Sequence, residues 1–263
     1  MAKIRAVILD WAGTTVDFGC FAPLTAFAEA FGTFGIEPDI EETRAPMGLA
    51  KRAHIEKMLE GERISALWRE KYEKPYTSED VDKIYAQFEP ALFRVLSEHA
   101  GPLPDVVEIV HELRGMGILI GSTTGYTRAM MDVVTPIAAI NGYAPDSLVC
   151  PDDTGGIGRP YPYMLWRNLE KLGIQSISEV IKIGDTAADI QEGKNAGCLT
   201  VGVLKGSSMM GLNETEFLNL SAREKANRYE NARREYKTAG ADFVVEDIRA
   251  VADMINQING GIL

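Results

Sequence analysis

Short apolar segments recur along the chain, separated by stretches with helical periodicity. Five of these segments are rich in branched side chains and border Gly, Asp, Ser or Thr: residues 6–10, 118–122, 180–185, 199–203 and 243–245. Apolar runs of this kind are typical of strands that are buried on both faces of a sheet. The stretches between them include residues 105–117, 127–141, 161–173 and 187–197, and several end at a glycine. This alternation predicts an α/β fold with a doubly wound, mostly parallel sheet.

One long region lacks the strand pattern. Between about residues 21 and 99 the periodicity is helical, over residues 41–60, 63–72 and 78–97, with Ser78 as the expected N-cap of the last helix. We therefore predict an all-helical cap domain at residues 19–100, inserted between core segments at residues 1–18 and 101–263. It should cover the carboxyl edge of the sheet, where open α/β folds bind their ligands. The polar stretch at residues 215–238 is predicted to be one solvated helix of the core.

Charge and cysteine content limit the partners. Lys and Arg number 27 against 38 Asp and Glu, and this net charge of −11 argues against electrostatic binding to nucleic acid or an anionic membrane. Cys20, Cys150 and Cys198 lie far apart without a CxxC pair, as is typical of a reduced intracellular protein. No apolar run approaches the length of a membrane span or a signal-peptide core. We expect a cytoplasmic protein with a small anionic substrate and no nucleic-acid or membrane partner.

Polar groups stand where three of the predicted strands end. Asp10 follows the first strand, Thr123 and Thr124 follow the second, and Asp185 and Asp189 follow the third. If these strands are neighbours, their carboxyl ends meet at one edge of the sheet. Carboxylates at such an edge can hold Mg²⁺, and an Asp with no other role can attack phosphorus.

A cation is expected close to these groups. Arg159 precedes a proline at the start of a predicted helix, and Arg and hydroxyl groups neutralise phosphoryl oxygens. Each residue alone has a structural alternative, since an Asp at a strand end usually caps a turn. Their combination in this order indicates phosphoryl chemistry.

The order of these motifs resembles that of the haloacid dehalogenase superfamily along the whole core. One position departs from the pattern of the superfamily's phosphatases, which carry a second Asp two residues after the nucleophile. Here that position is Ala12. The residue that would protonate a leaving oxygen is therefore missing, and a plain phosphatase is disfavoured.

A more specific resemblance, to the phosphonoacetaldehyde hydrolase branch of that superfamily, covers almost the whole chain. It is carried by Cys20 and by residues 10–15, 47–54, 121–128, 158–162 and 184–186. The resemblance implies hydrolysis of the C–P bond of phosphonoacetaldehyde to acetaldehyde and phosphate, with Mg²⁺ as cofactor. It also implies a homodimer, formed through cap helices.

The resemblance assigns roles to individual residues. Lys51 would form a Schiff base with the aldehyde and Asp10 would attack phosphorus, because an iminium can accept the electrons of the C–P bond. His54 would relay protons, and Met47, Lys51 and His54 would share one face of a helix. The implied metal site consists of Asp10, the carbonyl of Ala12, and Asp185, with Asp189 orienting the shell. The implied substrate-binding residues are Arg159, Thr124 with Thr123 as the alternative, Gly48, Cys20 and Tyr126.

Two other functions are compatible with the sequence. One is a sugar-phosphate phosphatase of the same superfamily in which Lys51 only binds substrate. The other is a phosphate-binding protein without catalysis, although the presence of both Asp10 and Asp185 argues against it. His99 and His111 have no motif support and are predicted to lie outside the site.

Overall fold

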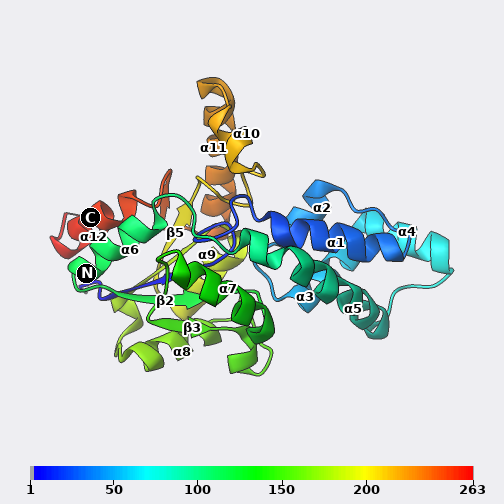
Figure 1. Cartoon of the computed structure of the whole chain (residues 1–263), viewed down its shortest axis with the longest axis horizontal. Coiled ribbons are helices and arrows are strands. Elements are labelled where there is room, and N and C mark those ends of the chain that lie inside the picture. Colours follow the sequence, from blue (N-terminus) through cyan, green and yellow to red (C-terminus); the bar gives the residue numbers. More distant parts are fainter. Residues whose placement is uncertain (1–2, 263) are drawn as a thin grey trace.

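A parallel sheet forms the centre of the computed structural model, which describes residues 3–262 (Figure 1). Its strands are β1 (Ala6–Leu9), β2 (Leu119–Thr123), β3 (Ser147–Val149), β4 (Val180–Gly184), β5 (Leu199–Val203) and β6 (Phe243–Val245). Their order is β3-β2-β1-β4-β5-β6, and every neighbouring pair is parallel. The predicted doubly wound α/β fold is confirmed.

The central position of β1 explains its apolar sequence. Ala6 pairs with Leu119 of β2 on one side and with Val180 of β4 on the other. Side chains of a strand alternate between the two faces, so Val7 and Leu9 belong to one hydrophobic cluster and Ala6 and Ile8 to another. Both faces are therefore buried, and the strand order reverses between β1 and its neighbour β4.

Helices cover both faces of this sheet. They are α6 (Val106–Gly115), α7 (Arg128–Ile140), α8 (Tyr163–Leu172), α9 (Ala187–Ala196), α10 (Glu214–Leu218), α11 (Ala222–Ala239) and α12 (Ala250–Asn259), with short 3-10 turns η1 (Leu96–His99), η2 (Pro151–Thr154) and η3 (Ile177–Glu179). Residues of α6, α7 and α12 share a cluster with Val7, whereas α8 packs on Ala6 and Ile8. Among residues 3–262, no helix is both long and apolar enough to cross a bilayer.

The prediction for residues 215–238 was wrong in two respects. The stretch forms two helices, because Ser221 caps α11 and forms a capping box with Glu224. It is also not fully solvated, since Tyr229 and Tyr236 are buried against the core. The Tyr236 hydroxyl donates to the carbonyl oxygens of Asp185 and Val203 and so anchors α11 to the sheet.

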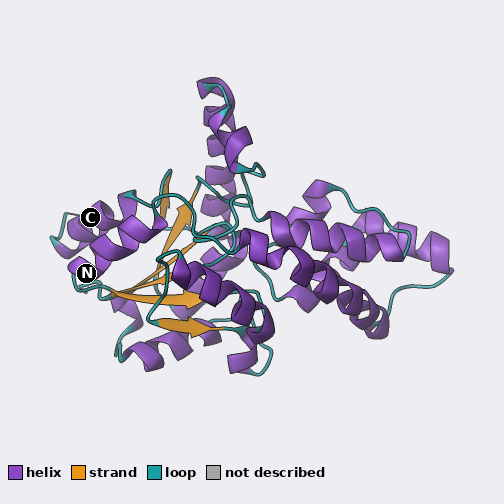
Figure 2. Cartoon of the chain, viewed as in Figure 1, coloured by secondary structure: helices purple, strands orange, loops and turns teal. Residues whose placement is uncertain are grey.

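A group of helices extends to one side of the sheet, and Figure 2 shows no strand in it. These cap helices are α1 (Phe21–Thr33), α2 (Ile40–Arg44), α3 (Lys51–Glu60), α4 (Glu62–Tyr72) and α5 (Ser78–Val95). Helices α1 and α5 pack together, and the rings of Phe27 and Phe88 stack with centroids 4.3 Å apart. The expected helical character of this region is confirmed.

Two details of the cap helices differ from the prediction. Thr77, rather than Ser78, caps α5, because its side chain and that of Asp80 form a capping box. The helix predicted at residues 41–60 is interrupted between Arg44 and Lys51, where Gly48 adopts a φ of +90°. Met47 therefore precedes α3, and the prediction that it shares a helix face with Lys51 was wrong.

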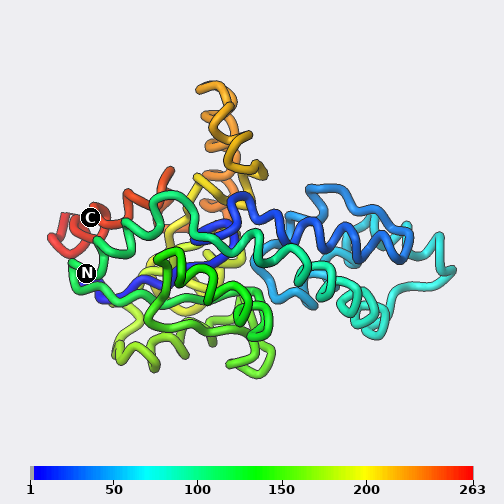
Figure 3. Tube along the Cα trace, in the orientation of Figure 1, coloured from blue at the N-terminus to red at the C-terminus, as the bar shows by residue number. Residues whose placement is uncertain are grey.

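Two chain segments connect the cap helices to the sheet, as the trace in Figure 3 shows. They are held together, because the amide of Leu103 on the return segment donates to the carbonyl of Thr15 on the outgoing one at 2.8 Å. Asp17 accepts from the first amides of α1 and also lies 2.9 Å from His99 Nδ1. The hydrogen bond to Asp17 raises the pKa of His99. His99 thus belongs to the connection and not to the sheet edge.

Candidate active site

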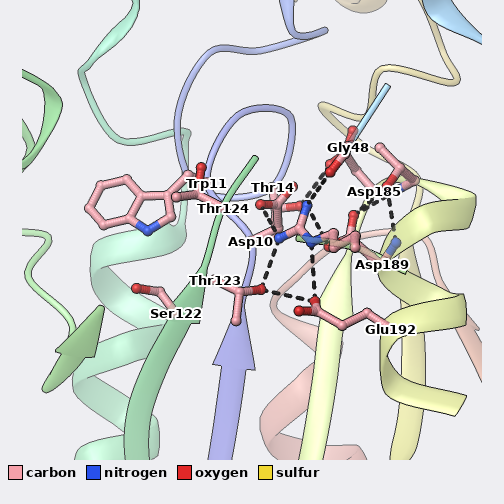
Figure 4. Close-up of polar contacts among 12 residues, drawn as sticks. Asp10, Trp11, Thr14, Gly48, Ser122, Thr123, Thr124, Asp185, Asp189 and Glu192 are labelled. Carbon is pink, nitrogen blue, oxygen red and sulfur yellow. Dashed lines mark hydrogen bonds and ion pairs between the residues drawn. The ribbon is translucent and has the colours of Figure 1, made fainter. Parts of the chain in front are cut away.

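The ends of three neighbouring strands bring polar side chains together (Figure 4). Asp10 follows β1, Thr123 ends β2 and Asp185 follows β4, and these strands are adjacent in the sheet. Asp189 is added from the first turn of α9, which begins directly after β4. Trp11 and Ser122 are also near this edge, but their side chains point away from the cluster.

Arg159 occupies the middle of this cluster and is fully buried. Its Nη2 lies 2.7 Å from Asp10 Oδ1, its Nη1 lies 3.1 Å from Asp189 Oδ1, and its Nε donates to Glu192 Oε2 at 3.1 Å. Burial alone would lower the pKa of Arg159, but Asp10, Asp189 and Glu192 hold it well above its usual value. A permanent positive charge is therefore fixed beside the Asp10 carboxylate.

Lys182 and Glu192 are site residues that the sequence reasoning missed. The Lys182 ammonium lies 2.8 Å from Asp189 Oδ1, 2.7 Å from Thr123 Oγ1 and 3.3 Å from Glu192 Oε2. Two signals could have found them. Lys182 interrupts an apolar strand that is buried throughout, and Glu192 follows Asp189 by three residues on the same helix face.

The carboxylates around Asp185 are crowded. One oxygen atom from each of Asp10, Asp185 and Asp189 lies within 4.8 Å of the others. Burial, followed by the charges of Asp10 and Asp189, raises the pKa of Asp185 well above its usual value. A divalent cation would relieve this repulsion, and carboxylate oxygens are the ligands that Mg²⁺ prefers. The residues present therefore fit a magnesium site.

The three carboxylates differ in how available each is to a bound cation. Burial alone would raise the pKa of Asp189, but Arg159 and Lys182 hold it below its usual value, so its charge is already paired. Asp185 instead accepts two neutral donors, the Thr14 hydroxyl at 3.1 Å and the Ser208 amide at 2.9 Å. Gly13 permits this approach, since a Cβ there would lie 2.3 Å from Asp185 Oδ2. Asp10 also pairs with Arg159 through Oδ1, but unlike Asp189 it lines the cavity between this edge and the cap helices, so Asp10 and Asp185 are the carboxylates better placed to bind a cation.

A small cavity of about 10 Å³ lies between this edge and the cap helices. It is lined by Asp10, Ala12, Cys20, Met47, Gly48, Lys51, Thr124, Gly125, Tyr126, Arg159 and Thr186. Most of the residues predicted for the site are among them, whereas Thr123, His54, Asp185 and Asp189 are not. Close contact between cap and core depends on Gly48, where a Cβ would lie 2.3 Å from Thr186 Oγ1.

The two threonines at the end of β2 have different environments. The Thr123 hydroxyl donates to Glu192 Oε2 at 3.0 Å and accepts from Arg159 and Lys182, so it holds these charges in place. Thr124 lines the cavity, and its hydroxyl oxygen accepts from the Tyr126 amide at 3.0 Å. Thr124 is the hydroxyl placed to meet a ligand.

Lys51 enters the cavity from the first position of α3. It is buried, and its ammonium lies 4.8 Å from the centre of the Tyr126 ring and 5.9 Å from that of Phe27. Burial is the main reason that the pKa of Lys51 is lowered from its usual value. The lysine is therefore more easily deprotonated than an exposed one.

Two buried neighbours of Lys51 remain uncharged. His54 stacks on Phe27 with ring centroids 3.9 Å apart, and its Nε2 lies 2.8 Å from the carbonyl oxygen of Thr43. Burial and then the charge of Lys51 lower the pKa of His54 well below its usual value. Burial likewise raises the pKa of the Cys20 thiol well above its usual value. Both residues therefore add polar but neutral groups around the lysine.

Comparison with known proteins gives a consistent family. Residues 4–197 match the family model described as haloacid dehalogenase-like hydrolase. A phosphonoacetaldehyde hydrolase of Lysinibacillus sphaericus is 48% identical, over 98% of this chain and 96% of its own length. A bifunctional phosphonoacetaldehyde hydrolase/aminoethylphosphonate transaminase of Clostridioides difficile is also 48% identical, and this chain spans 40% of its length.

Solved structures agree with that result. The crystal structure of a phosphonoacetaldehyde hydrolase-like protein from Oleispira antarctica superposes with a TM-score of 0.95 at 34% identity, covering 99% of this chain and 94% of that one. A hydrolase from Pseudomonas syringae, at a TM-score of 0.69 and 21% identity, shares the fold. The chain belongs to the haloacid dehalogenase-like hydrolases, in their phosphonoacetaldehyde hydrolase family.

Proposed function

We propose that the protein hydrolyses the C–P bond of phosphonoacetaldehyde, giving acetaldehyde and phosphate. The observation that carries this proposal is that Lys51, a buried lysine of the cap helices, opens into the same cavity as Asp10 and Arg159. An amine and a carboxylate can then act on two ends of one small molecule. Relatives that are 45–48% identical are named phosphonoacetaldehyde hydrolases, which supports the same substrate.

The first step takes place on Lys51. A lysine must be neutral to attack a carbonyl carbon, and the lowered pKa of Lys51 favours that form. The amine adds to the aldehyde and water leaves, which gives a protonated imine. Met47, Gly48, Cys20 and Tyr126 enclose this end of the substrate. We assign to His54, which lies one turn further along α3 and outside the cavity lining, a relay of protons to and from Lys51.

The second step takes place at Asp10. Its carboxylate forms a bond to phosphorus while the C–P bond breaks, and the electrons of that bond move into the iminium to give an enamine. The leaving group is carbon in this reaction, so no side chain is needed at Ala12 to protonate a leaving oxygen. Water then cleaves the aspartyl phosphate, and protonation and hydrolysis of the enamine release acetaldehyde from Lys51.

Hydrogen-bond donors on the core bind the phosphoryl oxygens during this step. We assign Arg159 and the Thr124 hydroxyl to that role, because both line the cavity beside Asp10. When bound by Asp10, Asp185 and the carbonyl of Ala12, Mg²⁺ would neutralise charge on the phosphoryl group. Asp189 orients this shell through its pairs with Arg159 and Lys182.

We further propose that residues 19–100 form a cap domain in a cytoplasmic homodimer. The hydrophobic contact between α1 and α5 and the two linked connecting segments support a separate cap. The family resemblance of the sequence is the support for the homodimer.

A coupled assay tests the function. Acetaldehyde release is followed with alcohol dehydrogenase and NADH, and phosphate release is measured in parallel on a panel of sugar phosphates. We expect turnover of phosphonoacetaldehyde and loss of it in Lys51→Arg, whereas Lys57→Arg, an exposed lysine on the same helix, stays active. Rapid hydrolysis of a sugar phosphate that survives Lys51→Arg would instead indicate a phosphatase, and no turnover at all would indicate a binding protein.

A further inference from the structure

Arg44 of the cap helices reaches the loop at residues 207–211, which contacts Asp185. Arg44 is the last residue of α2, and its Nη1 donates to the carbonyl oxygen of Ser208 at 2.6 Å. The amide of the same Ser208 donates to Asp185 Oδ2 at 2.9 Å. The peptide groups around Ser208 therefore connect a cap guanidinium to a carboxylate of the acidic cluster.

Groups of both the cap and the core lie against the Arg44 guanidinium. On the cap side, the guanidinium carbon lies 5.3 Å from the centre of the Phe21 ring. On the core side, Gly211 adopts a φ of +67°, and a Cβ there would lie 2.6 Å from Arg44 Nη1. A side chain at this position would displace the end of the guanidinium, and the positive φ itself favours glycine. Groups of both the cap and the core thus surround Arg44.

The sizes of two adjoining cavities indicate that this contact breaks when a substrate enters. The site cavity of about 10 Å³ holds about one water molecule, which is too little for any phosphonate. A second cavity of about 460 Å³ lies beside it, between α2 and the core, and its walls include Arg44 and Ser208. The two cavities share Met47 and Thr186. Entry of a phosphonate requires the site cavity to enlarge, and separation of cap and core along this shared wall would enlarge it and break the contact between Arg44 and Ser208.

We propose that Arg44 is a latch that couples cap closure to the position of Asp185. When the cap closes, Arg44 holds the Ser208 carbonyl, and the Ser208 amide in turn fixes Asp185 for its cation. When the cap opens, the Ser208 carbonyl loses the Arg44 donor while Arg228 of α11 still holds the Met210 carbonyl at 3.0 Å, so the Ser208 peptide and its bond to Asp185 are held less firmly. Arg44 is thus a positioning residue that acts through Ser208. The inference rests on the proposed function for the identity of the substrate.

The test compares Arg44→Met and Arg44→Lys with the matched control Arg63→Met. Arg63 lies on α4 and pairs with Glu42 of α2, the helix that carries Arg44, so its ion pair stays within the cap helices. Amide hydrogen exchange of peptides covering residues 204–212 reports the loop, and calorimetric titration with Mg²⁺ reports the metal site. We expect Arg44→Met to speed exchange at the loop and to weaken Mg²⁺ binding about fivefold, less than for a residue that touches a metal ligand directly. Arg44→Lys should recover part of both effects, and Arg63→Met should match the wild type.

Exchange and Mg²⁺ affinity that stay at wild-type values in Arg44→Met would overturn the latch, and so would equal changes in Arg63→Met. If Arg44→Met does not fold, Gly211→Ala takes its place, because it keeps the guanidinium but places a Cβ 2.6 Å from the present position of Nη1. Both readouts are independent of turnover. A protein that fails to cleave phosphonoacetaldehyde but shows the expected exchange pattern would contradict the proposed function and keep the latch.

Discussion

The core and the cap contribute opposite environments to one cavity. On the core side, Asp10, Arg159 and Glu192 are buried in a network of paired charges. On the cap side, Lys51 lies over two aromatic rings and forms no ion pair with any residue between 3 and 262, and burial lowers its pKa. Paired charges stay ionised and fixed, whereas an unpaired buried amine gives up its proton more easily. The core is thus suited to phosphoryl transfer and the cap to carbonyl chemistry.

The largest effect is expected from loss of the core nucleophile, which should leave the chemistry of the cap intact. Asp10→Asn removes the attacking carboxylate, so we expect the rate of acetaldehyde release to fall by about 10⁴-fold or more. The cap half should survive, and the variant should still form the imine on Lys51. A stopped-flow record of acetaldehyde release measures the loss, with Asp132→Asn on the exposed side of α7 as the control. Activity within tenfold of the wild type would exclude Asp10 as the nucleophile.

Removal of the metal should affect the core half alone. Chelation with EDTA leaves Asp10 and Asp185 repelling each other, so we expect phosphonate binding to weaken and turnover to fall by about 10³-fold. Added Mg²⁺ should restore both. Phosphonate affinity is measured by calorimetry with and without EDTA. Unchanged affinity and rate after chelation would contradict the assignment of the acidic cluster.

The residues behind Arg159 should have an intermediate effect. Glu192→Gln removes a charge that faces both Arg159 and Lys182, so we expect kcat to fall by about 10- to 100-fold as Arg159 loses its orientation. Breaking a buried ionic network also costs about 3 to 5 kcal/mol of stability. Steady-state kinetics and thermal unfolding measure the two effects. Glu170→Gln, on the exposed side of α8, is the matched control and should change neither.

The smallest effect concerns the connection between the two regions. Asp17 raises the pKa of His99 in the folded state, so the protonated pair stabilises the protein below the unfolded pKa of about 6.5. That stability is lost as the pH rises through the folded pKa. His99→Gln should lower the melting temperature by about 2 °C at pH 5.5 and have no effect at pH 9. Thermal scans at both values test this, with His111→Gln as the control. A loss of equal size at both pH values would exclude the titration of His99 as its cause.

The sequence was informative where one residue type dominates a segment. The apolar runs predicted five strands, and the polar residues at their ends lie together because the strands are neighbours. Strand β3 was missed because only two of its three residues are apolar, whereas the equally short β6 is apolar throughout. The helix predicted at residues 41–60 continued through Met47 because periodicity is insensitive to one glycine at positive φ.

Long-range pairing is what the sequence could not provide. In the sequence, Lys182 is an irregularity in an apolar strand and Glu192 resembles a surface residue of a helix. Only the fold places both side chains beside Thr123. The contact between Arg44 and Ser208 joins residues 164 positions apart, so no local pattern could indicate it. The pKa of Lys51 likewise depends on burial that only the assembled cap and core create.

The central claim is that Lys51 of the cap and Asp10 of the core act on one substrate. The most direct test is reduction with borohydride during incubation with phosphonoacetaldehyde, followed by peptide mass spectrometry. We predict that Lys51 alone is modified, with an ethyl group in the wild type and with a phosphonoethyl group in Asp10→Asn, where the C–P bond is not cleaved. A fully active protein whose Lys51 remains unmodified after borohydride treatment would contradict this account.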